Sequence, residues 1–181
     1  MLEVGCGAGD LARALDAAGY RVLAIDPQAP EGAIFRRVTI EELDDAGPFD
    51  AAVASYSLHH IENLDRALDR LASLLKPRGT LVIEEFGWDR LDQATAAWYA
   101  RRQEGQSVET ALAEWATEHE GLHGFTDMRA ALDDRFEEHI FEWRPYLYRC
   151  LDRDDLEANE RDAITRGEIQ AIGFRYIGSR A

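Results

Sequence analysis

Basic residues are scarce in this chain. Its 181 residues contain 20 Lys and Arg against 35 Asp and Glu, which gives a net charge of −15. Nucleic-acid-binding proteins need clustered Lys and Arg to contact phosphates, and anionic membrane surfaces attract the same residues. The composition therefore argues against nucleic acids and membranes as partners. Lys76 is the only lysine, and this skew toward arginine and alanine indicates a GC-rich bacterial genome.

Cysteine is also scarce. Cys6 and Cys150 are too few for a disulfide framework, which favours a reducing, cytoplasmic location. The sequence has no apolar run near the roughly 20 residues that a membrane-spanning helix needs. We expect no signal peptide, because a basic segment followed by an apolar core and a cleavage site is missing. These absences favour a globular protein of one α/β domain.

Glycines are concentrated near the start of the chain. Residues 2–4 (Leu-Glu-Val) predict a buried strand, which runs directly into a loop with Gly5, Gly7 and Gly9. Glycine can adopt positive φ and allows a ligand to approach the backbone closely. The helix predicted after this loop would direct its positive end at the same place. The pattern therefore predicts a site for a nucleotide-like ligand.

An acidic residue follows the next predicted strand. Asp10 is the expected N-cap of the helix after the loop, and Gly19 is expected to end it. Residues 20–25 then predict a second buried strand, which ends in Asp26. A carboxylate in this place can accept hydrogen bonds from both hydroxyls of a ribose.

Two more strands flank a helix further along. Residues 49–55 predict the fourth strand and residues 80–84 the fifth, which follows a turn at 76–79. Asn63 is the expected N-cap of the intervening helix, whose apolar residues recur at helical spacing. The alternation of strands and helices indicates an α/β fold.

The order of these segments resembles one family. The pattern Glu-x-Gly-x-Gly-x-Gly over residues 3–9 is similar to the first motif of class I S-adenosylmethionine-dependent methyltransferases. Residues 49–85 resemble the small-molecule methyltransferases grouped around quinone and sterol methylation. A dinucleotide fingerprint would instead need a small residue in place of Asp10. The resemblance implies a three-layer α/β/α Rossmann-like fold with a mostly parallel seven-stranded sheet, an antiparallel last strand and a helical insertion after strand five.

The resemblance also implies how S-adenosylmethionine is held, with S-adenosylhomocysteine as the product. The small side chain of Cys6 is expected to have a structural role within the loop. The expected cofactor-binding residues are Glu3, Gly5, Cys6, Gly7 and Gly9 for the methionine part, Asp26 and Pro27 for the ribose, Thr39 and Ile40 for the adenine, and Ser55, Tyr56 and His60 at the site of transfer.

Two features depart from the family pattern. Members usually carry an acid after strand three that binds the adenine amino group, whereas this chain has Thr39 there. Thr39 can still accept that hydrogen bond, or it can form a capping box with Glu42 at the start of a short helix; the sequence leaves both open. Members also generally have helices before the first strand. We therefore expect a truncated or misassigned start, or a second chain that supplies this cover.

The second half is expected to select the substrate. The pattern predicts helices over about 89–102, from Ser107, and over about 126–134, with Asp89 and Thr126 as caps of the first and last. Residues 88–135 would then be an insertion. Because it follows strand five at the carboxyl edge of the sheet, we interpret it as a lid over the substrate; the alternative is a structural decoration.

The last part closes the predicted sheet. Residues 136–148 predict a strand bent at Pro145, 152–166 a polar helix, and 169–177 an alternating final strand. The chain is thus predicted to be a single domain, 1–181, made of a cofactor-binding half (1–87), the insertion (88–135), and C-terminal strands and helix (136–181).

Candidate residues for chemistry follow strands four and five. His60 can contact the cofactor or substrate or act as a catalytic base near neutral pH; the alternative is that it only lines the loop. Glu84, Trp88 and His123 are candidate substrate contacts. His119 and His123 are four residues apart, but nearby glycines interrupt the helix and no zinc motif is present, so we predict no metal site.

These features together predict an enzyme. It would transfer a methyl group from S-adenosylmethionine to an O, N or C atom of a small molecule, mainly by aligning the nucleophile and excluding water. The acceptor, the attacked atom and the base are left open, as is a homodimer. One alternative is a catalytically silent cofactor-binding scaffold or sensor, and another is a nicotinamide-dependent enzyme on a similar sheet.

Overall fold

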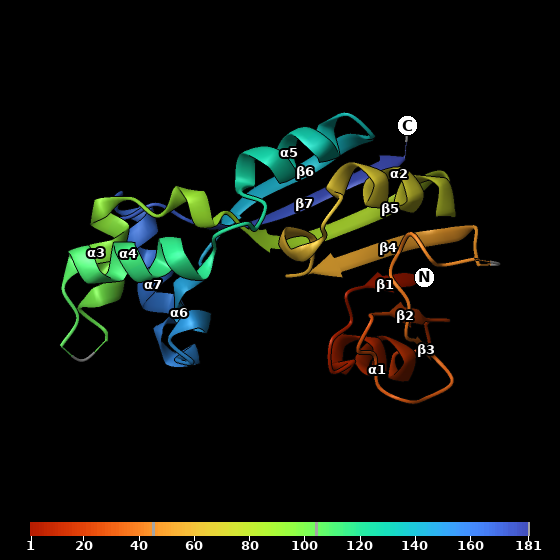
Figure 1. Ribbon diagram of the computed structural model, residues 1–181, viewed down its shortest axis with the longest axis horizontal. Helices are drawn as coiled ribbons and strands as arrows, with labels where there is room; N and C mark the ends of the chain where they lie inside the picture. Colours follow the sequence, from red (N-terminus) through yellow and green to blue (C-terminus); the bar gives the residue numbers. More distant parts are fainter. Residues whose placement is uncertain (45, 104, 181) are drawn as a thin grey trace.

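The computed structural model describes residues 1–44, 46–103 and 105–180. In these residues a seven-stranded sheet runs in the order β3-β2-β1-β4-β5-β7-β6 (Figure 1). The strands are β1 (Leu2–Val4), β2 (Leu23–Ile25), β3 (Phe35–Arg36), β4 (Phe49–Ser55), β5 (Leu75–Phe86), β6 (Phe136–Arg144) and β7 (Gly173–Arg180). The helices are α1 (Asp10–Ala17), α2 (Leu64–Leu74), α3 (Gln93–Ala100), α4 (Val108–Glu118), α5 (Phe125–Asp133), α6 (Leu147–Cys150) and α7 (Glu157–Thr165), with short 3₁₀ turns η1 (Leu58–His60), η2 (Trp88–Arg90) and η3 (Asp154–Leu156).

The sheet is parallel from β3 to β5, and β7 is antiparallel to both β5 and β6. This confirms the predicted mostly parallel sheet with an antiparallel last strand. The chain builds β1, β2 and β3 toward one edge and then returns to place β4 on the other side of β1. In open α/β sheets, ligands bind at the carboxyl ends of the strands where the order reverses in this way.

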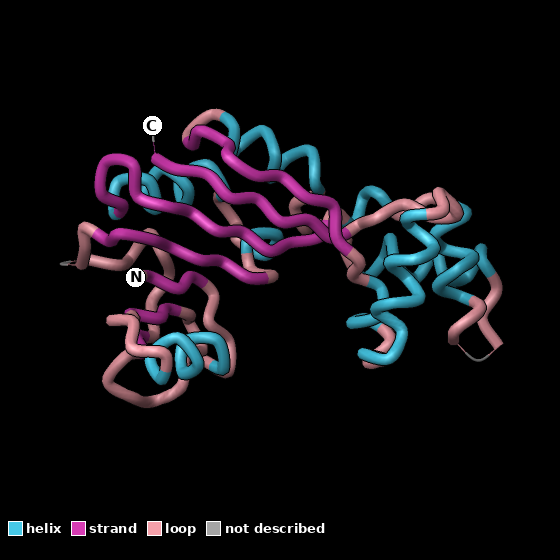
Figure 2. Tube along the Cα trace, turned by 180° about the vertical axis from the view of Figure 1, so that it is seen from behind, coloured by secondary structure: helices cyan, strands magenta, loops and turns pink. Residues whose placement is uncertain are grey.

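The main core lies between the sheet and the helices α2 and α5. Leu68 and Leu71 of α2 and Met128 and Leu132 of α5 are fully or almost fully buried against inward-facing strand residues such as Phe174. Figure 2, seen from behind, shows strands β4, β5, β7 and β6 in front of these helices. A smaller cluster of alanines and Cys6 packs α1 against β2.

The face of the sheet turned away from α2 and α5 carries one apolar row. Val53, Val82, Ile177 and Ile140 are paired in register across β4, β5, β7 and β6. Ile140 is 44% exposed. The core of these four strands therefore lies on the α2 and α5 side.

Helices α3, α4, α6 and α7 form an outer lobe beyond the ends of β5 and β6 (Figure 1). Trp98, Trp115 and Leu147 are buried together there, with Ile172 from the segment before β7. Helix α5 packs on the sheet instead, so the predicted insertion at 88–135 contributes to two places. The role of the insertion as a lid stays a prediction. Among the described residues, no helix combines the length and apolar character needed to cross a bilayer.

Some predicted helix caps are confirmed and others are wrong. Asn63 caps α2 and Ser107 caps α4, as predicted. Gly9, in the left-handed conformation, occupies the N-cap position of α1, so Asp10 is the first helical residue rather than the cap. Gly19 follows α1 with φ 90°, as expected of a helix stop.

The predicted starts of the first and third helices in the insertion are also wrong. Asp92 caps α3, because Asp89 belongs to the preceding 3₁₀ turn. The carboxylate of Asp89 instead accepts a hydrogen bond from the backbone N–H of Phe125 at 2.7 Å. This distant carboxylate satisfies the first turn of α5, whose N-cap position is Gly124, and Thr126 lies inside the helix.

Strand boundaries differ from the prediction as well. Strand β5 begins at Leu75, which pairs with Phe49, and the predicted turn at 76–79 bulges out before regular pairing resumes at Thr80. Strand β6 ends at Arg144, and the residues after Pro145 form α6 instead of continuing as a strand. The final strand, Gly173–Arg180, begins four residues and ends three residues later than predicted.

A buried carboxylate holds the outer lobe together. Glu160 of α7 has no exposed surface. It accepts hydrogen bonds from the backbone N–H groups of Tyr146 (2.8 Å), Leu147 (3.0 Å) and Tyr148 (2.9 Å) at the start of α6. Burial raises the pKa of Glu160, and the three N–H donors oppose this shift.

Replacing Glu160 with Ala is expected to destabilise the protein by about 3 kcal/mol or more, because each buried N–H group left without an acceptor costs roughly 1–3 kcal/mol. Urea unfolding followed by circular dichroism measures the change. Glu157→Ala is the matched control, since Glu157 is a more exposed glutamate of the same helix, paired with Arg161. It is expected to cost less than about 0.5 kcal/mol. Equal effects of the two variants would contradict this role of Glu160.

Candidate functional site

The loop between β1 and α1 contains three glycines in the left-handed region. Gly5, Gly7 and Gly9 have φ of 72°, 49° and 82°. A Cβ on Gly5 would lie 2.2 Å from the Cβ of Ser57, and one on Gly9 would lie 2.5 Å from the ring of Phe35. A Cβ on Gly7 would have no atom within 4 Å. Packing therefore requires Gly5 and Gly9, whereas Gly7 leaves open space beside the backbone.

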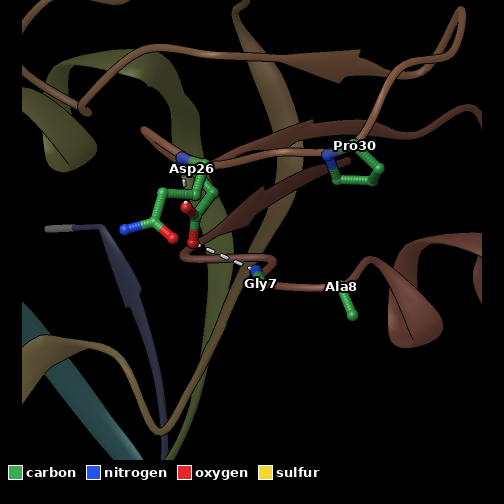
Figure 3. Close-up of a pocket in the computed structure, with 5 residues that line it drawn as sticks. Gly7, Ala8, Asp26 and Pro30 are labelled. Carbon is green, nitrogen blue, oxygen red and sulfur yellow. Dashed lines mark hydrogen bonds between the residues drawn. The ribbon is translucent and has the colours of Figure 1, made fainter.

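Asp26 at the end of β2 fixes this loop. Its Oδ2 accepts a hydrogen bond from the backbone N–H of Gly7 at 3.0 Å, and its Oδ1 accepts one from Gln28 at 2.7 Å. Figure 3 shows the carboxylate directed at Gly7, with Ala8 and Pro30 beside it. These residues line a cavity of about 440 Å³. Each carboxylate oxygen keeps a second lone pair that a ligand hydroxyl can use.

A larger cavity of about 720 Å³ lies at the carboxyl ends of β1, β2 and β4. This volume is within the range of small-molecule sites. The cavity lies where the strand order reverses, as expected for a ligand site in such a sheet. The lining residues are Val4, Gly5, Gly7, Ile25, Asp26, Pro27, Val38, Thr39, Ile40, Glu41, Glu42, Tyr56, Ser57, His60, Ile61, Glu62, Asn63 and Arg66.

Glu3 is buried in β1, next to the cavity-lining residue Val4. Its side chain is 3% exposed, and its Oε2 has no hydrogen-bond partner among the described residues. Burial raises the pKa of Glu3 to about 7. Because a buried polar atom without a partner is costly, this oxygen is suited to a donor or cationic group of a ligand.

A second buried carboxylate positions the turn after β4. Glu85 is fully buried, accepts a hydrogen bond from the backbone N–H of Leu58 at 2.7 Å and from Nδ1 of His59 at 2.8 Å. The pair anchors η1, which brings His60 to the cavity. Burial, together with the neighbouring His59, lowers the pKa of His60. The imidazole of His60 is therefore mostly neutral at pH 7 and can accept a proton.

Comparison with known proteins identifies the family. Residues 1–125 match the family described as "Methyltransferase domain". The chain belongs to this methyltransferase family. Members of this family depend on S-adenosylmethionine.

Two curated relatives and one solved structure illustrate the similarity. The ubiquinone biosynthesis O-methyltransferase of Rhodopseudomonas palustris is 33% identical over 96 residues, which cover 46% of this chain and only 38% of that protein's length. An uncharacterised methyltransferase of Mycobacterium bovis is 34% identical over 138 residues, covering 64% of this chain and 68% of that protein. An S-adenosylmethionine-dependent methyltransferase from Mesorhizobium loti superposes with a TM-score of 0.63 at 16% identity, covering 99% of this chain and 89% of that chain. This last likeness shows the fold.

The 720 Å³ cavity gathers most of the predicted cofactor residues. Those that line it are Gly5, Gly7, Asp26, Pro27, Thr39, Ile40, Tyr56 and His60. Four others do not line it. Glu3 precedes the lining residue Val4 in β1, Cys6 packs in the small cluster under α1, Gly9 lies against Phe35, and Ser55 precedes the lining residues at the end of β4. Cofactor contacts of all twelve stay a prediction.

Thr39 makes the hydrogen bonds of a capping box with Glu42. Its backbone N–H donates to Oε2 of Glu42 at 3.1 Å, and its Oγ1 accepts from the backbone N–H of Glu42 at 3.3 Å. The residues that follow form a turn rather than a helix. Thr39 nevertheless lines the cavity, and its hydroxyl oxygen keeps a second lone pair that can accept a hydrogen bond from the adenine amino group. The two interpretations of Thr39 are therefore compatible.

The side chains of the three predicted substrate contacts bind other residues of the fold. Glu84 forms an ion pair with Arg175 between β5 and β7. Trp88 donates through Nε1 to a backbone carbonyl in the loop before α5 at 3.1 Å. His123 hydrogen-bonds through Nε2 to the carbonyl of Ile61 at 2.8 Å. None of the three lines the cavity, because these hydrogen bonds and the ion pair hold their side chains against other parts of the fold.

The sequence interpretation missed several lining residues between the end of β4 and the first turn of α2. Ser57, Ile61, Asn63 and Arg66 face the cavity. A signal was present, since a helix N-cap that directly follows a central strand places its first turn at the carboxyl edge of the sheet. Within the described residues, no group of three His, Cys, Asp or Glu side chains is arranged to hold a metal ion.

The glycines of the loop give a direct test of the packing. Gly5→Ala is expected to destabilise the protein by about 3 kcal/mol or more, since a left-handed alanine costs roughly 1–2 kcal/mol and the new Cβ overlaps Ser57. Gly7→Ala is the control, with positive φ but open space, and is expected to cost only about 1–2 kcal/mol. Urea denaturation of both variants compares them. A Gly7→Ala variant as unstable as Gly5→Ala would disprove the difference in packing.

Proposed function

We propose that this methyltransferase domain binds S-adenosylmethionine in the 720 Å³ cavity and supports methyl transfer to an O, N or C atom of a small molecule. One observation carries the proposal. The cavity joins the glycine loop and Asp26 on one side to His60 on the other, at the carboxyl ends of β1, β2 and β4. The name of the Rhodopseudomonas relative, an O-methyltransferase, makes oxygen acceptors the first class to test.

The residues present fit the cofactor. The open space at Gly7 accommodates the methionine part close to the backbone. The partnerless Oε2 of buried Glu3 suits the α-ammonium group. The free lone pairs of Asp26 suit the two ribose hydroxyls, and Thr39 and Ile40 lie on the wall assigned to the adenine.

The chain's own groups would then position and deprotonate the acceptor. When bound, S-adenosylmethionine supplies an activated methyl group. Neutral His60 accepts the proton that the acceptor's hydroxyl or amine loses. Glu85 and His59 fix the turn that carries His60, and the ring of Tyr56 helps to exclude water from the same wall.

Calorimetric titration with S-adenosylhomocysteine tests the cofactor site. The wild-type chain is expected to bind it with micromolar affinity and not to bind NAD. Gly7→Ala and Asp26→Ala are each expected to weaken binding at least tenfold, because the first fills the open space and the second removes the acceptor for the ribose and for the Gly7 N–H. Asp10→Ala, an exposed aspartate close by, is the control. An Asp26→Ala variant with full affinity would contradict the ribose assignment.

Methyl transfer is measured separately on the same purified protein. Binding of S-adenosylhomocysteine with no methylation of any O, N or C acceptor would instead support the silent scaffold. The engagement of Thr39 with Glu42 is the observation that keeps this alternative in view.

The affinity for S-adenosylhomocysteine is expected to rise about tenfold between pH 6 and pH 8. Glu3 has a pKa of about 7 in the free protein, and the ligand's ammonium group binds its ionised form, of which pH 8 supplies about tenfold more than pH 6. Glu3→Gln is expected to remove this pH dependence.

The pH dependence of the free protein's stability has the opposite sign to that of ligand affinity. The folded protein favours protonated Glu3. The contribution of Glu3 to stability is therefore lost as pH rises from its ordinary pKa of 4.5 to its raised pKa of about 7. An affinity independent of pH would contradict the role of Glu3.

A further inference from the structure

Arg149 of α6 lies beside the cavity without an acidic partner. Its guanidinium carbon is 5.0 Å from the centroid of the Tyr56 ring. Within residues 1–44, 46–103 and 105–180, no carboxylate oxygen lies within 4.0 Å of its nitrogens. Its neighbours are tyrosines, since the guanidinium also lies 5.4 Å from the centroid of the Tyr148 ring and pairs with the Tyr148 side chain. Arg153, one turn further on, is by contrast paired with Asp155 at 2.7 Å. In a chain with 35 acidic residues, an arginine with no acidic partner beside a cavity is available for an external anion.

Tyr56 connects Arg149 to the cavity. Tyr56 lines the cavity, and its ring contacts that of Tyr146, with ring centroids 5.3 Å apart. Its backbone has φ 52°, a strained conformation for tyrosine, and its N–H donates to the carbonyl of Glu84 at 2.8 Å. Tyr146 in turn stacks on Phe86 at 4.2 Å with an interplanar angle of 7°. The Tyr56 ring is therefore held against the outer lobe at the edge of the cavity.

The position of Arg149 is fixed by the same lobe. Glu160 accepts three hydrogen bonds from the backbone at the start of α6, and Arg149 is the third residue of that helix. A group that is already positioned loses less conformational entropy when it binds a ligand. Arg149 is thus prepared to bind without moving its backbone.

The chemistry of a stacked guanidinium sets the ligand. When its face lies over an aromatic ring, the N–H donors at its edge stay directed outward and match the two oxygens of a carboxylate. The cavity itself is lined by three glutamates, Glu41, Glu42 and Glu62, and by a single arginine, Arg66. These carboxylates would repel an anionic group, so such a group would be oriented toward Arg149.

We infer that the acceptor of the methyl group is an anionic small molecule whose carboxylate is bound by Arg149 beside Tyr56. This rests on the proposed function, because it assigns a substrate class to the same cavity. The aromatic rings of Tyr56 and Tyr146 make an aromatic acid the class that fits best. Arg149 is then the residue that selects acids over neutral acceptors of the same shape.

The test compares two ligands that differ only in the carboxylate. 3,4-Dihydroxybenzoate and 1,2-dihydroxybenzene are titrated by calorimetry into protein saturated with S-adenosylhomocysteine. The wild type is expected to bind the acid at least tenfold more tightly. Arg149→Gln is expected to abolish this preference while leaving the affinities for 1,2-dihydroxybenzene and S-adenosylhomocysteine unchanged. Arg153→Gln, which changes the net charge equally, is expected to keep the preference.

The outcomes separate this inference from the proposed function. Equal binding of the two ligands, a preference that survives in Arg149→Gln, or no binding of either ligand would each overturn the role of Arg149 while binding of S-adenosylhomocysteine stands. A wild-type chain that fails to bind S-adenosylhomocysteine would contradict the proposed function itself, and this inference with it. Unchanged affinity of Arg149→Gln for S-adenosylhomocysteine shows that the variant is folded.

Discussion

The reversal of strand order between β1 and β4 is the constraint on which the site depends. Parallel strands direct their carboxyl ends to one edge, and the loops that leave β1 and β4 there turn to opposite sides of the sheet. The cavity lies between these loops. The glycine loop after β1 and the turn after β4 form its two walls, and Asp26 ties the first of these to the end of β2.

Of three buried glutamates, two stabilise the fold around the site and one is suited to bind a ligand. Glu160 accepts three backbone hydrogen bonds and joins α6 to α7. Glu85 accepts bonds from Leu58 and His59 and anchors η1. Glu3 alone among these three has a buried oxygen without a partner. Because a satisfied carboxylate stabilises the fold and an unsatisfied one costs free energy, Glu3 is the glutamate suited to bind a ligand.

The features that could be predicted from the sequence depend on short-range signals. The caps Asn63 and Ser107 act three residues away, and the glycine loop is a contiguous motif. The mostly parallel sheet with an antiparallel last strand was implied by the resemblance of several such segments to one family. Strand alternation places Glu84 and Glu85 on opposite faces of the sheet, but it does not show that Glu84 pairs with Arg175 and Glu85 with His59.

The features that were missed depend on contacts between distant segments. Asp89 accepts from Phe125, 36 residues away, and for that reason does not cap its own helix. His59 is paired with Glu85 across 26 residues. Arg149 meets Tyr56 only because α6 returns to the carboxyl edge of β4. Such pairs follow from the packed fold, and no local periodicity in the sequence encodes them.

A crystal structure of the chain with S-adenosylhomocysteine tests the central claim most directly. The account predicts the ligand in the cavity between Gly7 and His60, with the ribose hydroxyls within hydrogen-bond distance of Asp26 and the ammonium group directed toward Glu3. Ligand bound elsewhere on the sheet or in the outer lobe, with this cavity empty, would contradict it.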